Sequence, residues 1–218
     1  MPDYQYISLT VENGIATLTI SNPPANLLSR AVLTEIASAV DELAKNPAAR
    51  ALIITGAGTF FVVGADIKEI AGLTGAAQGQ EAATLGQAVF DKLEALSIPT
   101  IAAINGHCLG GGNEMAMSCS MRIASDRARF GQPEINLGIM PGFGGTQRLA
   151  RLVGKAKALE LNLTGDMLNA QTAYEIGLVN KVVPEAEVLK QALGLAKKNR
   201  REKQAAGRAD PARNEGGS

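Results

Sequence analysis

Two acidic residues stand in surroundings that carry little other charge. Glu114 is the one charged residue in the stretch from Thr100 to Met121, and Glu134 lies between Pro133 and an isoleucine. Burial in such surroundings raises the pKa of a carboxyl group and suits it to proton transfer near neutral pH. Two carboxyl groups that meet at one water molecule can divide the work, one accepting a proton and the other donating one.

The presence of each carboxyl group can also be explained without a catalytic role. An acid in the first turn of a helix is stabilised by the helix dipole by roughly 0.3 to 1 kcal/mol, which accounts for Glu114. Glu134 is then an ordinary acid of a surface loop. The residue types alone leave both interpretations open.

A run of three glycines precedes Glu114. Gly110, Gly111 and Gly112 stand before Asn113–Met117, a segment of mostly good helix formers, so they are expected at a helix N-terminus. Unpaired backbone N–H groups and the positive end of the helix dipole lie there, and a ligand carbonyl can approach closely. The run can therefore hold an oxyanion, or it simply allows tight packing of strand against helix. It is neither a Walker A sequence nor a G-x-G-x-x-G motif, so phosphate binding by those loops is not supported.

The sequence contains few of the residues that other catalytic mechanisms require. His107 is the only histidine, which excludes a metal site of several histidines and leaves it as the one base for a Ser-His-Asp or Cys-His arrangement. The two cysteines, Cys108 and Cys119, are too few for a disulfide scaffold. No metal site is predicted.

Composition limits the possible partners. The 218 residues include 21 Lys and Arg against 21 Asp and Glu, so there is no positive excess to favour nucleic acid. An apolar fraction of 46% supports one buried core, and no signal peptide or membrane-spanning run is found. A single cytoplasmic domain without membrane or nucleic-acid partners is expected.

The elements that must position these residues follow an α/β pattern. Residues 4–11 and 15–20 read as two antiparallel strands joined at Asn13-Gly14, and Ser29 caps an amphipathic helix that stops before Pro47. Apolar segments at 51–55 and 100–104, with a helix between them ending near residue 96, predict strands buried on both faces. We therefore expect helices packed against a sheet.

The last third of the chain is predicted to be mainly helical. Helices are expected over 145–152, 155–163 and 170–176, a strand over 178–183, and a final helix beginning near Pro184. From residue 197 to the end there are seven basic and three acidic residues and no large apolar one. We therefore divide the chain into a domain of residues 1–198 and a polar, disordered tail of residues 199–218.

Several colinear segments resemble the enoyl-CoA hydratase (crotonase) family. The likeness runs in order from the first strand to about residue 198, which makes chance matching a poor explanation. It is carried by Ile104–Glu114, Phe130–Glu134, Pro141–Leu149 and Phe61–Glu69, with further matches at Leu163–Asp166 and Gly177–Val179.

The resemblance implies a hydratase that adds water, syn and reversibly, to a 2-trans-enoyl-CoA, with Glu114 and Glu134 as its catalytic acids. The backbone N–H groups of Ala65 and Gly111 would form the oxyanion hole for the thioester carbonyl. Ala25 and the segment Ala65, Asp66, Ile67 and Lys68 would bind the coenzyme A portion, together with Gly111. Coenzyme A is part of the substrate, so no separate cofactor is implied.

The resemblance also implies a spiral of repeated ββα units and assembly into trimers or hexamers. Family members continue beyond the equivalent of residues 188–198 with further helices, whereas this sequence becomes polar, so a shortened C-terminal helical region is expected.

Three other activities compete with the hydratase. Family isomerases commonly keep one of the two glutamates, which disfavours them here. A dehydratase or carbon–carbon lyase acting on another acyl-CoA, and a non-catalytic RNA-binding relative suggested by the basic tail, are the remaining alternatives.

Overall fold

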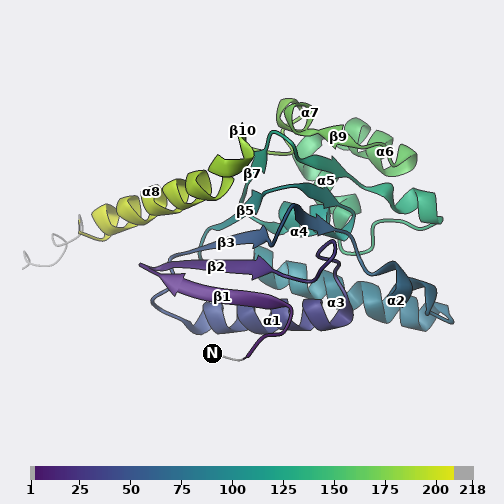
Figure 1. The fold of residues 1–218 in the computed structure, drawn as a ribbon, viewed down its shortest axis with the longest axis horizontal. Helices are drawn as coiled ribbons and strands as arrows, with labels where there is room; N and C mark the ends of the chain where they lie inside the picture. The colour runs from purple at the N-terminus through teal and green to yellow at the C-terminus, as the bar shows by residue number, and fades with distance from the viewer. Residues whose placement is uncertain (1–2, 209–218) are drawn as a thin grey trace, which may run out of the picture.

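The computed structural model describes residues 3–208. Ten strands form two sheets within this part of the chain (Figure 1). The larger sheet has the order β1-β2-β3-β5-β7-β10 and the smaller one β4-β6-β8-β9. The strands are β1 (Ile7–Glu12), β2 (Ile15–Ile20), β3 (Ala51–Gly56), β4 (Phe60–Val63), β5 (Thr100–Ile104), β6 (His107–Leu109), β7 (Met121–Ser125), β8 (Arg129–Gly131), β9 (Leu168–Asn169) and β10 (Lys181–Val183).

Helices follow most pairs of strands. They are α1 (Arg30–Lys45), α2 (Ile67–Ala71), α3 (Ala76–Glu94), α4 (Gly111–Ser118), α5 (Gly145–Val153), α6 (Lys155–Thr164), α7 (Ala170–Glu175) and α8 (Val188–Arg208), with short 3₁₀ turns η1 (Pro133–Leu137) and η2 (Glu185–Glu187). None of the helices in the described residues is long and apolar enough to cross a membrane.

The chain repeats a ββα unit. In β3-β4, β5-β6 and β7-β8, the first strand of each pair joins the large sheet in parallel and the second joins the small sheet in parallel. Helical segments then return the chain to the next pair. The predicted α/β spiral of repeated ββα units is confirmed.

The strands β3 and β5 of the large sheet are buried on both faces, as their apolar sequences predict. In β3, Leu52 and Ile54 pack into the main core with α1 and α3, while Ile53 packs with Val188 and Ala192 of α8. Figure 1 shows α1 and α3 lying together below the sheet.

The hairpin turn and the helix cap predicted in the first half are confirmed, although β1 begins at Ile7, three residues after the predicted start. Strands β1 and β2 pair antiparallel across Asn13-Gly14. The hydroxyl of Ser29 accepts a hydrogen bond from the N–H of Val32 and caps α1, which ends at Lys45, two residues before Pro47.

Two boundaries in the C-terminal part differ from the prediction. Strand β10 covers only the last three residues of the predicted 178–183 strand. Helix α8 continues to Arg208, so the backbone is helical over the first ten residues of the segment predicted as a disordered tail. Alanine, arginine, lysine, glutamate and glutamine propagate a helix without burial, and hydrophobic patterning does not detect this. The remainder, residues 209–218, lies outside the described residues, and the domain boundary at 198 stays a prediction.

Candidate active site

The ends of three parallel strands bring distant segments together. Strands β4, β6 and β8 are neighbours, with Val63 paired to Leu109 and Leu109 paired to Gly131. Their carboxyl ends therefore lie at one edge of the small sheet, where open α/β sheets bind ligands. The segments that follow them, 64–65, 110–111 and 132–134, meet at this edge.

A cavity of about 450 Å³ lies at that edge. Glu114 and Glu134 both line it, together with Ala65, Gly111 and Ile67. Most of the remaining wall is apolar and comes from β4, β6, α2 and the turn after it, α3, η1 and the segment after η1: Val63, Ile70, Leu73, Ala82, Ala83, Leu109, Leu137, Ile139, Met140 and Phe143. An apolar cavity with a few convergent polar groups is typical of a small-molecule site.

Glu114 is held at the N-termini of two helices. It lies in the first turn of α4 and is only 1% exposed. Its Oε1 accepts hydrogen bonds from the N–H of Phe143 at 2.8 Å and from the N–H of Gly145 at 2.6 Å. Because α5 begins at Gly145, the carboxylate also satisfies a donor that no helical carbonyl can reach. Both helix ends favour the ionised form.

Opposing effects set the pKa of Glu114. Burial, the largest, and the neighbouring charge of Glu134 raise the pKa, and the net result is a pKa of about 7 against an ordinary value of 4.5. The N–H groups of Gly145 and Phe143 and the positive charge of Arg148 act in the opposite direction. Glu114 can therefore exchange a proton near neutral pH.

Glu134 lies in η1 and presents an unpartnered oxygen. The side chain is half-buried, and its Oε2 is buried without a hydrogen-bond partner among the described residues. Burial raises the pKa of Glu134 to about 6. Its Oε1 lies beside Gly110, where a Cβ atom would approach it to 3.0 Å and where the φ angle of 51° is one that side chains rarely adopt. Glycine at this position leaves room for the carboxylate.

Two backbone amides complete the polar part of the wall. Ala65 follows β4, and Gly111 is the first residue of α4. Among the hydrogen bonds of the described residues, neither N–H group is a donor. The next N–H along the chain from Ala65 is paired, because Asp66 donates to the carbonyl of Leu28, and the N–H before Gly111 is paired, because Gly110 donates to the carbonyl of Gly131. Two unpaired N–H groups in one cavity wall can bind a single oxygen atom.

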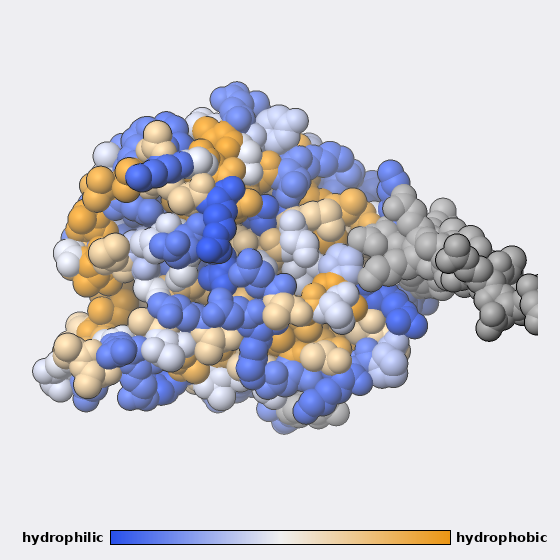
Figure 2. Space-filling model, turned by 180° about the vertical axis from the view of Figure 1, so that it is seen from behind, coloured by the Kyte–Doolittle hydropathy of each residue, from blue (hydrophilic) through white to orange (hydrophobic). Residues whose placement is uncertain are grey.

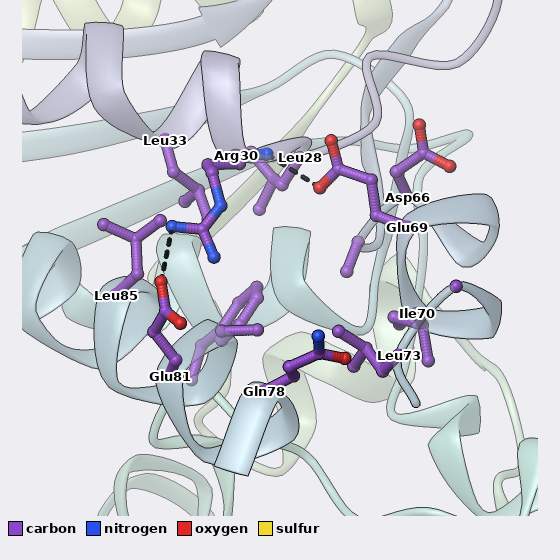
Figure 3. A pocket seen from close by; sticks show the side chains of 14 residues that line it. Leu28, Arg30, Leu33, Asp66, Glu69, Ile70, Leu73, Gln78, Glu81 and Leu85 are labelled. Atoms are coloured by element: carbon purple, nitrogen blue, oxygen red, sulfur yellow. Dashed lines mark hydrogen bonds and ion pairs between the residues drawn. The ribbon is translucent and has the colours of Figure 1, made fainter. Parts of the chain in front are cut away.

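A second cavity of about 370 Å³ adjoins the first, between α1, α2 and α3 (Figure 3). The side chains of Arg30 and Glu81 lie 3.0 Å apart on one side of it, and the N–H of Arg30 donates to Glu69. The two cavities share five lining residues: Ala65, Ile70, Leu73, Ala82 and Phe143. They therefore lie on two sides of one largely apolar wall.

The sequence pattern described as "Enoyl-CoA hydratase/isomerase" matches residues 10–209, which is most of the chain. The protein belongs to this family. A probable enoyl-CoA hydratase of Bacillus subtilis is 48% identical over 193 residues, and a crotonyl-CoA hydratase of Syntrophomonas wolfei is 50% identical over 195. Each alignment covers 88% of this chain and 75% of the relative.

Solved structures of similar proteins share the fold. The crystal structure of enoyl-CoA hydratase from Bacillus anthracis superimposes with a TM-score of 0.86 at 39% sequence identity. That comparison covers 89% of this chain and 76% of the other. The predicted family and fold are thereby confirmed.

Of the residues that the family resemblance assigns to coenzyme A binding, some line the two cavities and others do not. Ile67 lines the first cavity, and Asp66 lines the second while its Oδ1 caps α2 by accepting from the N–H of Lys68 at 2.9 Å. Lys68 is exposed on α2 and Ala25 lies beside β4, where its carbonyl accepts from the N–H of Val63. Neither Lys68 nor Ala25 is in the wall of the two cavities described above.

Sequence reasoning assigned no role to the segment that holds Glu114. Phe143 and Gly145 contribute only their backbone N–H groups, and the type of a residue says nothing about where its amide points. The glycines between residues 142 and 145, immediately before a helix, were the available signal.

Proposed function

We propose that this chain is an enoyl-CoA hydratase, a hydro-lyase that adds water reversibly to a 2-trans-enoyl-CoA to give a 3-hydroxyacyl-CoA. One observation carries the proposal: Glu114 and Glu134 line the same cavity as the two unpaired amides of Ala65 and Gly111. Water addition needs a base, an acid and a site for the developing enolate oxygen, and these four groups can supply them. Relatives named as hydratases support the same conclusion.

In the proposed reaction the two carboxyl groups act on one water molecule. Ionised Glu114 accepts a proton from the water while the oxygen of that water attacks C3 of the enoyl group. Glu134, as the carboxylic acid, donates a proton to C2. Proton transfer from Glu114 to Glu134 then restores the starting state, and one water is consumed in each cycle. In the proposed syn addition, both new bonds form on the same face of the enoyl group.

The raised pKa values bring both carboxyl groups into the range in which they can exchange protons near neutral pH. The pKa of about 7 makes Glu114 a stronger base than an exposed glutamate, while its hydrogen bonds from Phe143 and Gly145 hold one oxygen fixed. The other oxygen of Glu114 and the unpartnered Oε2 of Glu134 remain for the water and the substrate.

The thioester oxygen is proposed to lie between the N–H groups of Ala65 and Gly111. Negative charge collects on that oxygen in the transition state, and prearranged donors in a largely apolar cavity stabilise it. Removing one such donor typically lowers kcat by 10²- to 10³-fold, or about 2.7 to 4 kcal/mol. Gly111 also benefits from the N-terminus of α4, whose dipole favours negative charge.

The remaining contacts with substrate are proposed from the family likeness. The acyl chain would occupy the apolar part of the first cavity, and the coenzyme A portion would run past Ala25 and the segment Ala65–Lys68. The reaction transfers no electrons and needs no separate cofactor.

The test is turnover of a series of enoyl-CoA thioesters, beginning with crotonyl-CoA. Hydration removes the conjugated double bond, so the reaction is monitored by the loss of ultraviolet absorbance. Mass spectrometry identifies the product as the 3-hydroxyacyl-CoA. A 3-enoyl-CoA supplied in parallel detects an isomerase. Isomerisation without hydration, or no turnover by folded protein, would overturn the proposal.

We also propose that the chain self-associates, in line with the trimers or hexamers expected for its family. Apolar residues are exposed on η1, on the segment that follows it and on α6, among them Leu137, Met140 and Leu163, which are 51%, 71% and 66% exposed. Figure 2, which views the molecule from behind, shows hydrophobic residues gathered at its left edge, and this edge corresponds to the right side of Figure 1, where α2 and α6 lie. Such a surface favours contact with another protein. The cytoplasmic location and the absence of nucleic-acid and membrane partners stay predictions.

A further inference from the structure

Arg148 is a buried cation close to the proposed catalytic centre. It lies on α5, and its side chain is only 7% exposed. Its Nε donates to Oε2 of Glu94 at 2.9 Å and its Nη2 to Oδ1 of Asp91 at 2.5 Å, so α3 supplies both of its anionic partners. A planar guanidinium held at several nitrogens has little freedom to move.

The remaining nitrogen reaches the segment that holds Glu114. Nη1 of Arg148 donates to the carbonyl oxygen of Phe143 at 3.0 Å. The N–H of the same Phe143 donates to Glu114, and the N–H of Gly145 does so two residues later. Arg148 therefore fixes the short segment from which both donors to Glu114 come.

Gly144 shows how closely this segment is fitted to the guanidinium. Its φ angle of 103° is one that side chains rarely adopt, and a Cβ atom there would overlap Nη1 of Arg148. Gly145 is fitted as closely on the other side, because a Cβ there would come within 2.8 Å of Oε1 of Glu114. Between α3 and Glu114 there is thus one continuous, closely packed connection.

We propose that Arg148 is a positioning residue for Glu114: anchored by Asp91 and Glu94, it holds the carbonyl of Phe143 so that two backbone amides converge on one oxygen of Glu114. It acts through the backbone and touches no reacting atom. This inference deepens the hydratase proposal and rests on it for the catalytic meaning of Glu114. Arg148 also favours the ionised form of Glu114, as the two backbone amides do, since its positive charge lowers the pKa of Glu114.

The perturbation that tests the proposal is Arg148→Met, which keeps much of the apolar stem and removes the charge and the donors. Misplacing a catalytic group by about 1 Å can lower a rate about 100-fold, so we expect kcat for crotonyl-CoA hydration to fall about 100-fold and KM to change less than 3-fold. Arg148→Lys retains the charge but not the fork geometry, and should recover part of the lost kcat. Arg151→Met, an exposed arginine of the same helix, is the matched control and should stay within 2-fold of the unchanged protein.

A readout that does not depend on turnover separates this proposal from the hydratase proposal. The Glu114 carboxyl can be titrated by ¹³C NMR in the Glu134→Gln background, which removes the coupled acid from η1. The other ionisable groups of this cluster are Arg148 on α5 and its partners Asp91 and Glu94 on α3. Arg148→Met should raise the midpoint of this titration, whatever reaction the protein catalyses, and Arg148→Lys should return it toward the original value.

A residue that only stabilised the fold would give different results in these experiments. If Arg148→Met lowers activity only in proportion to the loss of folded protein and leaves the Glu114 titration unchanged, the proposal is wrong. Should Arg148→Met fail to fold, the pair Asp91→Asn and Glu94→Gln removes the anchor while keeping Arg148. We expect that double variant to lose kcat about 10-fold with KM within 3-fold, and an unchanged kcat in it would likewise overturn the proposal.

Discussion

Replacing Glu114 by Gln removes its charge and its capacity to accept a proton while keeping its shape. The amide oxygen can occupy the place of Oε1 and still accept from the N–H groups of Phe143 and Gly145, so the loop should keep its position. General acid–base catalysis contributes about 10²- to 10⁴-fold to a rate. We therefore expect kcat to fall by 10²- to 10⁴-fold, or about 2.7 to 5.4 kcal/mol of transition-state stabilisation, with KM within about 3-fold.

The same substitution should change stability in a direction that depends on pH. A pKa raised from 4.5 to about 7 means that the folded protein holds this proton more tightly than the unfolded chain does. Stability therefore falls as the pH rises through that range, by roughly 3 kcal/mol at most. Gln has no proton to lose, so Glu114→Gln should gain stability relative to the unchanged protein between pH 5 and pH 8, by roughly 2 to 3 kcal/mol.

Two assays decide the point. Steady-state hydration of crotonyl-CoA gives kcat and KM, and urea unfolding of both proteins at pH 5 and pH 8 gives the stability difference. A variant that keeps more than a tenth of the original kcat refutes the assigned role. A stability difference that does not widen with pH would mean that Glu114 is not buried as described.

Three further changes have defined outcomes. Glu134→Gln should lower kcat by several orders of magnitude with little change in KM, because the proton is lost while the backbone donors remain; a kcat above a tenth of the original in this variant contradicts the role at C2. Gly111→Pro should abolish turnover while circular dichroism stays nearly unchanged, because proline is tolerated in a first helical turn but has no N–H for the oxyanion, and normal turnover would place that site elsewhere. The value of kcat/KM should fall as the pH drops below about 6, where both carboxyl groups become protonated, and a profile flat to pH 5 would show that neither acts as a base.

The sequence was sufficient for most of the secondary structure. Asn13-Gly14, the Ser29 cap and the apolar run of β3 each act within a few residues, through backbone angles, local hydrogen bonds and burial. The helical backbone of residues 199–208 was not visible in the sequence, because a polar segment of good helix formers carries no hydrophobic pattern.

The sequence also indicated candidate residues for the chemistry. Glu114 and Glu134 were identified as carboxyl groups in weakly charged surroundings, and the glycines before Glu114 as the start of a helix. Their motifs further indicated the family, and this was confirmed. Whether Glu134 was a surface acid or part of a site stayed open at that stage, because its neighbours in the chain say nothing about its neighbours in space.

The meeting of these groups at one cavity became visible in the three-dimensional structure. Parallel pairing of β4, β6 and β8 brings Ala65, Gly111 and Glu134 to one cavity, and such pairing joins segments far apart in the chain. The support of Glu114 is still less visible in a sequence, since it depends on two backbone amides and on one oxygen of Phe143 held by Arg148. Every residue other than proline carries the same N–H group, so its position in space, and not its side chain, makes it part of the site.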